Sequence, residues 1–179
     1  MQHIRAATLT DIGAITAIYR HHVLTGTASF EEAPPSEADM ANRLGAILER
    51  RLPYLCLETA DPATGQLRVA GYAYAGPYRP RSAYRFTVED SIYLAPGATG
   101  RGYGRMLLER LIADCRALNL REIVAVIGDS ANIPSICLHR QLGFRDVGTL
   151  HRVGFKFERW LDSVLMQLSL QGTDDHPDE

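Results

Sequence analysis

A glycine-rich segment is the first place where this sequence could bind a ligand through its backbone. Residues 99–105 read Thr-Gly-Arg-Gly-Tyr-Gly-Arg and lie between a predicted strand and a predicted helix. Glycines at such a junction let the backbone approach a ligand closely, and the free N–H groups of a helix start attract phosphate. Arg101 and Arg105 flank these amides and are suited to charge-assisted bonds with a pyrophosphate. An ordinary flexible turn is the alternative for the glycines alone.

Two adjacent carboxylates lie within the strand predicted just before this segment, over residues 84–94. The two-residue period of a strand places Glu89 on one face and Asp90 on the other. A carboxylate in the middle of a strand that feeds a core is unusual, so Glu89 is a candidate general base, acting directly or through water. For Asp90 we favour the alternative, which is a charge on the protein surface.

A third polar group lies on the helix predicted over residues 132–142. Asn132, Ser135 and His139 are spaced i, i+3 and i+7, so they form one line along the helix. A polar line facing the glycine segment could bind a cofactor and bring His139 to a reacting atom. The alternative is a solvated face, with Asn132 as the helix cap and His139 favoured by the helix dipole.

Length and composition restrict the class of protein. The chain has 179 residues, 46% of them hydrophobic, which predicts one domain over residues 1–170 followed by an acidic tail over 171–179. Nineteen basic against 21 acidic side chains exclude the strongly basic surface of a nucleic-acid-binding protein. No apolar run is long enough for a membrane span or a signal peptide, so we expect a cytoplasmic protein. Three widely spaced cysteines predict buried thiols rather than disulfides or a metal site.

Hydrophobic periodicity predicts a mixed α/β domain with the order β-α-α-β-β-β-α-β-α-β-β. The expected helices begin at three capping sequences, Thr10-Asp11, Ser36 with Asp39, and Asn132, and at the glycine segment. A turn is expected over residues 61–65. The expected strands cover residues 3–7, 54–59, 67–75, 84–94, 122–127, 144–153 and 161–170.

Together these pieces resemble the GNAT superfamily of acetyl-CoA-dependent N-acetyltransferases. Its motif Q/R-x-x-G-x-G/A corresponds to residues 99–104, with threonine at the first position. Three further segments resemble the phosphinothricin/methionine sulfoximine acetyltransferase branch: Thr-Val-Glu-Asp-Ser-Ile-Tyr at 87–93, Leu-His-Arg-Gln-Leu-Gly-Phe at 138–144, and Val-Gly-Phe-Lys-Phe-Glu-Arg-Trp-Leu-Asp at 153–162. The resemblance covers nearly the whole chain. It implies a mixed, mostly antiparallel central sheet flanked by helices.

The resemblance also implies a reaction and its participants. An acetyl group would move from acetyl-CoA to the α-amine of a small amino acid whose side chain bears tetrahedral phosphorus or sulfur. Glu89 would be the general base, and His139 would protonate the departing thiolate or orient the pantetheine arm. The residues expected to bind acetyl-CoA are Ile92, Tyr93, Leu94, Arg101, Gly102, Tyr103, Gly104, Arg105, Asn132 and Ser135.

Cationic and aromatic side chains would then bind the amino acid. The guanidinium groups of Arg79, Arg81 and Arg85 would hold its acidic groups, since arginine forks match carboxylate and phosphinate oxygens. The rings of Phe30 and Tyr84 would surround its aliphatic part. Lys156 lies in a resembling segment, which implies a place near the substrate. The alternatives are a solvated loop for each arginine and a core anchor for Phe30.

Two other functions remain open from the sequence. One is acetylation of peptide or protein N-termini, and the other is a non-catalytic sensor that binds acyl-CoA. The arginine-rich loop favours a small anionic substrate over peptides, and the presence of both Glu89 and His139 argues against the sensor. The resemblance further implies a homodimer, with no nucleic acid, membrane or metal as a partner.

Overall fold

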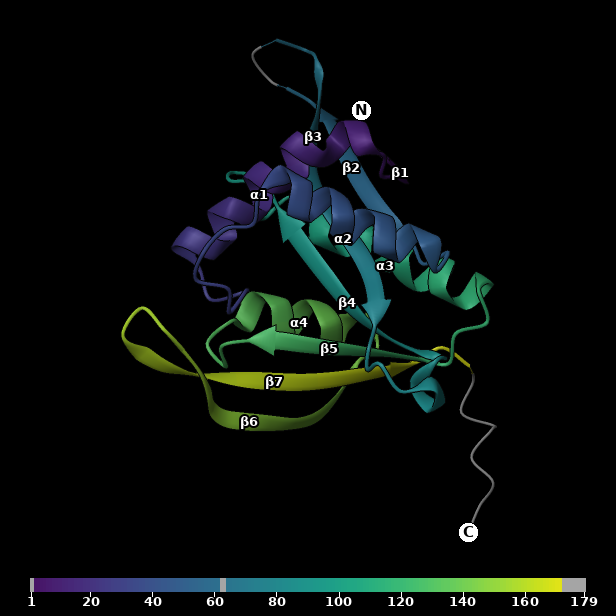
Figure 1. The fold of residues 1–179 in the computed structure, drawn as a ribbon, viewed down its shortest axis with the longest axis vertical. Helices are drawn as coiled ribbons and strands as arrows, with labels where there is room; N and C mark the ends of the chain where they lie inside the picture. Colours follow the sequence, from purple (N-terminus) through teal and green to yellow (C-terminus); the bar gives the residue numbers. More distant parts are fainter. Residues whose placement is uncertain (1, 62–63, 172–179) are drawn as a thin grey trace.

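The computed structural model describes residues 2–61 and 64–171 (Figure 1). It confirms the predicted order of strands and helices. Two boundaries were wrong by three residues. The strand expected from residue 84 begins at Thr87, because residues 82–84 form the 3₁₀ turn η2, and the strand expected to end at residue 153 continues to Lys156. Part of the predicted 61–65 turn and the tail from residue 172 onward lie outside the described residues. The elements are β1 (Gln2–Ala6), η1 (Leu9–Asp11), α1 (Ile12–Thr25), α2 (Glu37–Glu49), β2 (Tyr54–Ala60), β3 (Leu67–Pro77), η2 (Ser82–Tyr84), β4 (Thr87–Leu94), α3 (Tyr103–Ala117), β5 (Glu122–Gly128), α4 (Ile133–Gln141), β6 (Arg145–Lys156) and β7 (Arg159–Ser169).

The strands form one sheet in the order β1-β2-β3-β4-β5-β7-β6. Its adjacent strands are antiparallel except for β4 and β5, which run parallel. Their pairing extends only from Thr87 with Glu122 to Asp90 with Ala125, although both strands continue beyond it. Figure 1 shows β4 and β5 diverging from this short paired region. The predicted mixed, mostly antiparallel sheet is therefore confirmed, and it opens at its one parallel pair.

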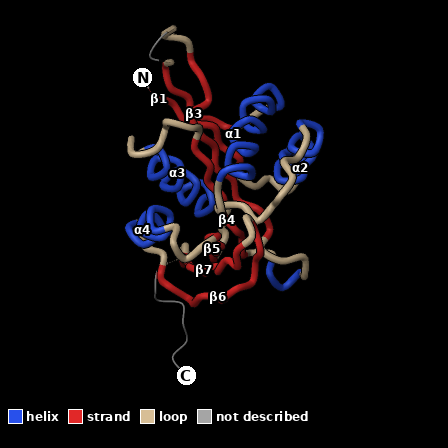
Figure 2. Tube along the Cα trace, turned by 90° about the vertical axis from the view of Figure 1, so that its left-hand side faces the viewer, coloured by secondary structure: helices blue, strands red, loops and turns tan. Residues whose placement is uncertain are grey.

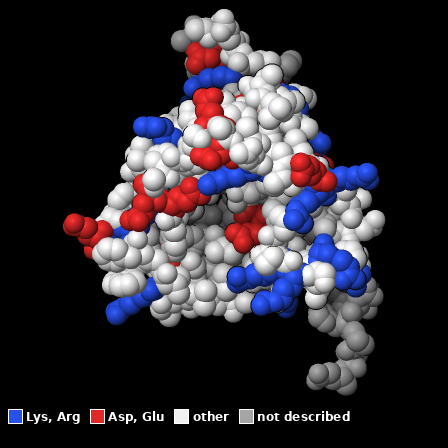
Figure 3. Space-filling view, in the orientation of Figure 1, with Lys and Arg blue, Asp and Glu red and all other residues white. Residues whose placement is uncertain are grey.

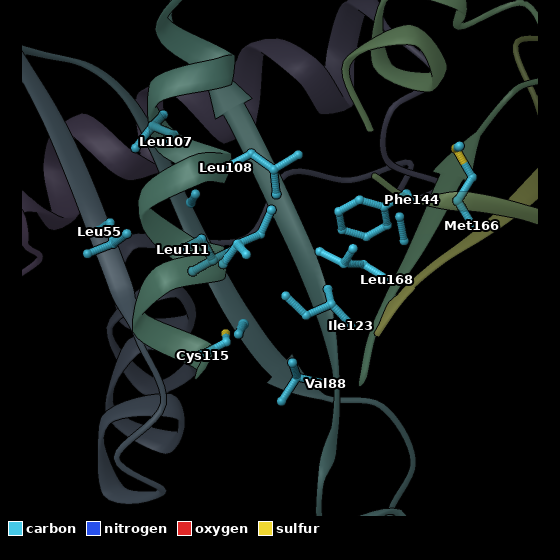
Figure 4. Packing of buried hydrophobic residues seen from close by; sticks show 14 of the residues in the cluster. Leu55, Val88, Leu107, Leu108, Leu111, Cys115, Ile123, Phe144, Met166 and Leu168 are labelled. Atoms are coloured by element: carbon cyan, nitrogen blue, oxygen red, sulfur yellow. The ribbon is translucent and has the colours of Figure 1, made fainter. Parts of the chain in front are cut away.

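Helices cover both faces of the sheet. Figure 2 shows α1 and α2 on one side of the strands and α3 and α4 on the other. The side chains between α1, α2 and the sheet form one apolar cluster, which contains Ile15, Leu44 and Tyr72. A second cluster lies between α3, α4 and the sheet and contains Leu108, Leu111 and Ile123 (Figure 4). Burial of these apolar side chains stabilises the packing of the helices on the sheet and so keeps β4 and β5 in place where they diverge.

Local sequence signals explain where the helices begin. Ser36 and Asp39 form the predicted capping box of α2, in which the Ser36 Oγ accepts a hydrogen bond from the Asp39 N–H at 3.2 Å. At α4, the Asn132 Oδ1 accepts from the Ser135 N–H at 3.4 Å, and Pro134 occupies the first turn. These caps fix the helix starts that later position the site. In the part of the chain that the structure describes, no helix has the length and apolarity needed to cross a membrane.

Candidate active site

A cleft of about 800 Å³ occupies the opening between β4 and β5. The far ends of both strands line it, from Asp90 to Leu94 and from Ala125 to Asp129. The start of α3 and one side of α4 contribute from one face of the sheet, and residues 26–28 contribute from the other face. Because residues from both faces line it, the cleft can bring together two ligands that approach from opposite sides.

The glycine segment forms the α3 end of this cleft. Gly100 and Gly102 have φ of 74° and 78°, a region that favours glycine. No side chain of the described residues caps α3 at Gly102, so the first N–H groups of the helix are free of such a partner. Arg105 lines the cleft and also pairs with Glu109 at 2.8 Å. Arg101 is exposed and lies outside the lining.

The remaining predicted coenzyme-binding residues divide between the cleft and the core. Tyr103 is buried in the apolar cluster beneath α3 rather than in the cleft wall. All the others line the cleft: Ile92, Tyr93, Leu94, Gly102, Gly104, Asn132 and Ser135. His22 of α1 also lines the cleft, and no sequence pattern predicted it; its Nε2 donates a hydrogen bond to the Leu94 carbonyl at 2.8 Å. This bond satisfies a carbonyl of β4 at the cleft.

Glu89 lies in the last part of β4 that still pairs with β5, where it is in register with Val124. Its side chain is half-buried and forms no ion pair with the described residues. Burial raises the pKa of Glu89, the neighbouring Asp90 raises it further, and the positive charge of Arg79 lowers it. A carboxylate with a raised pKa and no ion-pair partner is suited to accept a proton.

His139 is buried against the cleft, with 4% of its surface exposed. Its Nδ1 donates to the Ser135 carbonyl at 2.8 Å, and its Nε2 lies 3.0 Å from the Asp90 Oδ2. Burial lowers the pKa of His139, but the hydrogen bond and charge of Asp90 outweigh that effect and leave the pKa raised. Asn132 is indeed the cap of α4, but the solvated-face alternative was wrong for His139.

Two interpretations of single residues need correction. Asp90 is not a surface charge: it is 7% exposed and its carboxylate is paired with His139. β4 is interior to the sheet and Asp90 lies on the face that α3 and α4 cover, so its side chain is largely buried. Cys56 and Cys115 are buried as expected, whereas Cys137 is only partly buried and lines the cleft.

The loop after α1 forms the opposite wall. Lys156, at the end of β6, is buried, and its Nζ donates to the carbonyls of Gly26 at 2.9 Å and Ser29 at 2.6 Å. The ring of Phe30 packs against two positions without side chains, Gly128 and Gly154. The structure therefore places both Lys156 and Phe30 as anchors of this loop.

The predicted substrate arginines lie elsewhere. Arg79, Arg81, Tyr84 and Arg85 line a second hollow of about 510 Å³, beside the paired region of β4. Figure 3 shows the face covered by α1 and α2, with a central hollow bordered by acidic side chains and basic side chains gathered to its lower right. Among the three predicted substrate arginines, Arg79 is the one whose positive charge lowers the pKa of Glu89.

These features are typical of a group-transfer enzyme. Uncapped helix-start amides and the cationic Arg105 fit a phosphate-bearing ligand, and the same cleft is lined by His139 and by Asp90, the neighbour of Glu89 in β4. Glu89 itself is not among the lining residues. Such an arrangement suits transfer of a group carried by that ligand to an acceptor on the other face of the sheet.

Comparison with known proteins identifies the family. The acetyltransferase (GNAT) domain profile matches residues 4–165. The phosphinothricin N-acetyltransferase of Alcaligenes faecalis is 52% identical over 171 residues, which cover 96% of this chain and 84% of that protein. An L-methionine sulfoximine/L-methionine sulfone acetyltransferase of Pseudomonas aeruginosa is 41% identical over 174 residues, which cover 97% of this chain and 98% of that protein. The chain therefore belongs to the GNAT acetyltransferase family.

A solved structure agrees with this assignment. The crystal structure of a GNAT superfamily phosphinothricin acetyltransferase from Sinorhizobium meliloti in complex with AcCoA superposes with a TM-score of 0.90. The two proteins share 47% identity, and the match covers 99% of this chain and 94% of that one. The predicted family, fold, enzyme class and cosubstrate are confirmed at the level of the family.

The 26–30 loop lies close against β5, and this contact allows a test of the role of the loop as a wall of the cleft. A Cβ at Gly128 would overlap the Thr27 carbonyl oxygen and lie 3.0 Å from the Phe30 ring. We expect Gly128→Ala to displace the loop, to destabilise the protein by roughly 1–3 kcal/mol and to lower kcat/KM for the acceptor. Thermal unfolding and steady-state kinetics measure both effects. Gly148→Ala is the matched control, because a Cβ there meets nothing within 4 Å; equal effects of the two variants would contradict the account.

Proposed function

We propose that this enzyme transfers the acetyl group of acetyl-CoA to the α-amine of a small amino acid such as phosphinothricin or methionine sulfoximine. The observation that carries the proposal is the half-buried Glu89, which directly precedes the cleft-lining Asp90 in β4, together with the uncapped helix-start amides at the α3 end of the same cleft. The substrates named for the relatives at 52% and 41% identity support the same acceptor class.

Glu89 is the general base of this proposal. An ammonium group has no lone pair to attack a thioester, so the amine must first lose a proton. The raised pKa of Glu89 makes its carboxylate a stronger base than a solvent-exposed glutamate. The proton passes to this carboxylate directly or through water, and the acetyl group moves in a single transfer within the ternary complex.

The cofactor-binding residues act through position and charge. Backbone amides from Arg101 to Arg105 at the start of α3 and the side chain of Arg105, which lines the cleft, hold the diphosphate. The β4 segment from Ile92 to Leu94 lies along the arm that carries the thioester. A backbone N–H near Tyr93 or Leu94 stabilises the negative charge that develops on the carbonyl oxygen. Alignment of the two reactants removes much of the entropic barrier. His139 lies in the cleft wall, where its positive charge stabilises the departing thiolate.

The acceptor approaches from the α1/α2 face. Arg79 influences the charge of Glu89, which supports a role in holding the acidic group of the amino acid. Arg81, Tyr84 and Arg85 follow in the same loop, and Phe30 with Lys156 fixes the opposite wall.

We also propose a cytoplasmic homodimer. Large apolar side chains of the β6–β7 hairpin are exposed, among them Phe155 at 53% and Trp160 at 62%. Burial of such a patch against a second copy is favourable. Sedimentation distinguishes a dimer from a 19.8 kDa monomer, and a monomer alone would overturn this part.

A thiol-release assay tests the acceptor class. The protein with acetyl-CoA is offered phosphinothricin, methionine sulfoximine, the common amino acids and an alanine-initiated peptide. We expect release with the first two at least about tenfold faster than with the others, because the relatives at 52% and 41% identity are named for these acceptors. Faster release with the peptide would favour N-terminal acetylation, and coenzyme binding without release would favour the sensor.

Glu89→Gln tests the base. We expect kcat to fall by roughly 10²–10⁴-fold, with the affinity for acetyl-CoA nearly unchanged. In the wild type, kcat/KM should fall on the acid side as Glu89 takes up a proton, at a pH above that of an exposed glutamate, since its pKa is raised. Glu122→Gln in β5 is the control, because an amide oxygen can still accept from the Gln167 side chain. Unchanged turnover in Glu89→Gln would remove Glu89 as the base.

A further inference from the structure

The buried carboxylate of Asp90 has no part in the mechanism described so far. It lies on the face of β4 opposite to Glu89, is 7% exposed and belongs to the cleft wall. Its Oδ2 is 3.0 Å from the His139 Nε2. Its Oδ1 is buried and has no hydrogen-bond partner among the described residues. Burying a carboxylate costs free energy unless it has a defined partner. The burial of Asp90 beside His139 therefore suggests that the carboxylate has a function there.

The hydrogen bonds of His139 determine where its protons lie. The Ser135 carbonyl, 2.8 Å from Nδ1, can only accept, so Nδ1 carries a proton. An ionised carboxylate also only accepts, so Nε2 carries a proton where it faces Asp90. Asp90 therefore favours the imidazolium form of His139, with both ring nitrogens held in place. The Phe144 ring, 4.9 Å away, closes another side of the imidazole without adding a charge.

We propose that Asp90 is a positioning residue, which keeps His139 doubly protonated at the cleft wall so that the positive charge of His139 stabilises the departing thiolate. The inference rests on the proposed function. When the carbon–sulfur bond breaks, its electron pair stays on the sulfur, and the positive charge of the imidazolium stabilises the resulting thiolate. His139 keeps its N–H bonds to Ser135 and Asp90, and Asp90 remains ionised. The thiolate takes its proton from solvent.

The charges around the pair are consistent with this role. Asp90 is the acidic group in contact with His139, and it raises the histidine pKa against the effect of burial. Glu89 lies next to Asp90 in β4, and Cys115 approaches it from α3; the negative charge of Asp90 raises the pKa of both.

Asp90→Asn tests the proposal, because it removes the charge and keeps the shape. We expect kcat to fall by roughly tenfold or more, with KM for acetyl-CoA changed much less. The alkaline limb of the kcat profile should move to lower pH, since the neutral amide no longer favours the imidazolium. Asp90→Glu should restore part of the loss. Asp146→Asn is the matched control: it breaks an exposed ion pair with Arg140 of α4 and should leave kcat and the pH profile unchanged.

Two further measurements keep this proposal separate from the proposed function. NMR titration of His139 needs no substrate, and the pKa of His139 should be lower in folded Asp90→Asn than in the wild type. In a His139→Asn background, Asp90→Asn should cost little additional kcat, because the two residues act as a unit. An unshifted His139 titration, or additive losses in the double variant, would overturn the proposal. Absence of acetyl transfer by the wild type would instead overturn the proposed function.

Discussion

The early end of the β4–β5 pairing is the constraint on which the rest of the structure depends. A parallel pair that stops at Asp90 and Ala125, inside an otherwise continuous sheet, leaves two strand ends that face each other across a gap. Neighbouring strands on both sides hold the sheet together, so the gap stays local. The cleft therefore passes between the two helical layers without dividing the fold into two halves.

Opening a sheet leaves backbone polar groups without strand partners, and these groups must be satisfied in other ways. His22 donates to the Leu94 carbonyl on the β4 side, and Lys156 fixes the carbonyls of the adjacent 26–29 loop. Free N–H groups at the start of α3 keep their capacity for a ligand. The opening thus accounts for the polar contacts of the His22 and Lys156 side chains around it.

Local patterns were enough to predict the element order, the glycine segment and the alternation that places Glu89 and Asp90 on opposite faces of β4. Capping and periodicity depend on residues a few positions apart, so a single sequence reveals them. The pairing of Asp90 with His139 joins positions 49 residues apart, and Lys156 reaches a carbonyl 130 residues away. Such contacts follow from packing, and for that reason the burial of Asp90 and the anchoring role of Lys156 were missed.

The central claim is that the gap between β4 and β5 receives the coenzyme with its diphosphate at the start of α3. A crystal structure of this protein with acetyl-CoA tests that claim most directly. The account predicts diphosphate oxygens on the backbone amides of residues 101–105 and the thioester between the β4 and β5 ends, within reach of His139. Coenzyme bound outside this gap, or with its thioester directed away from both Glu89 and His139, would contradict it.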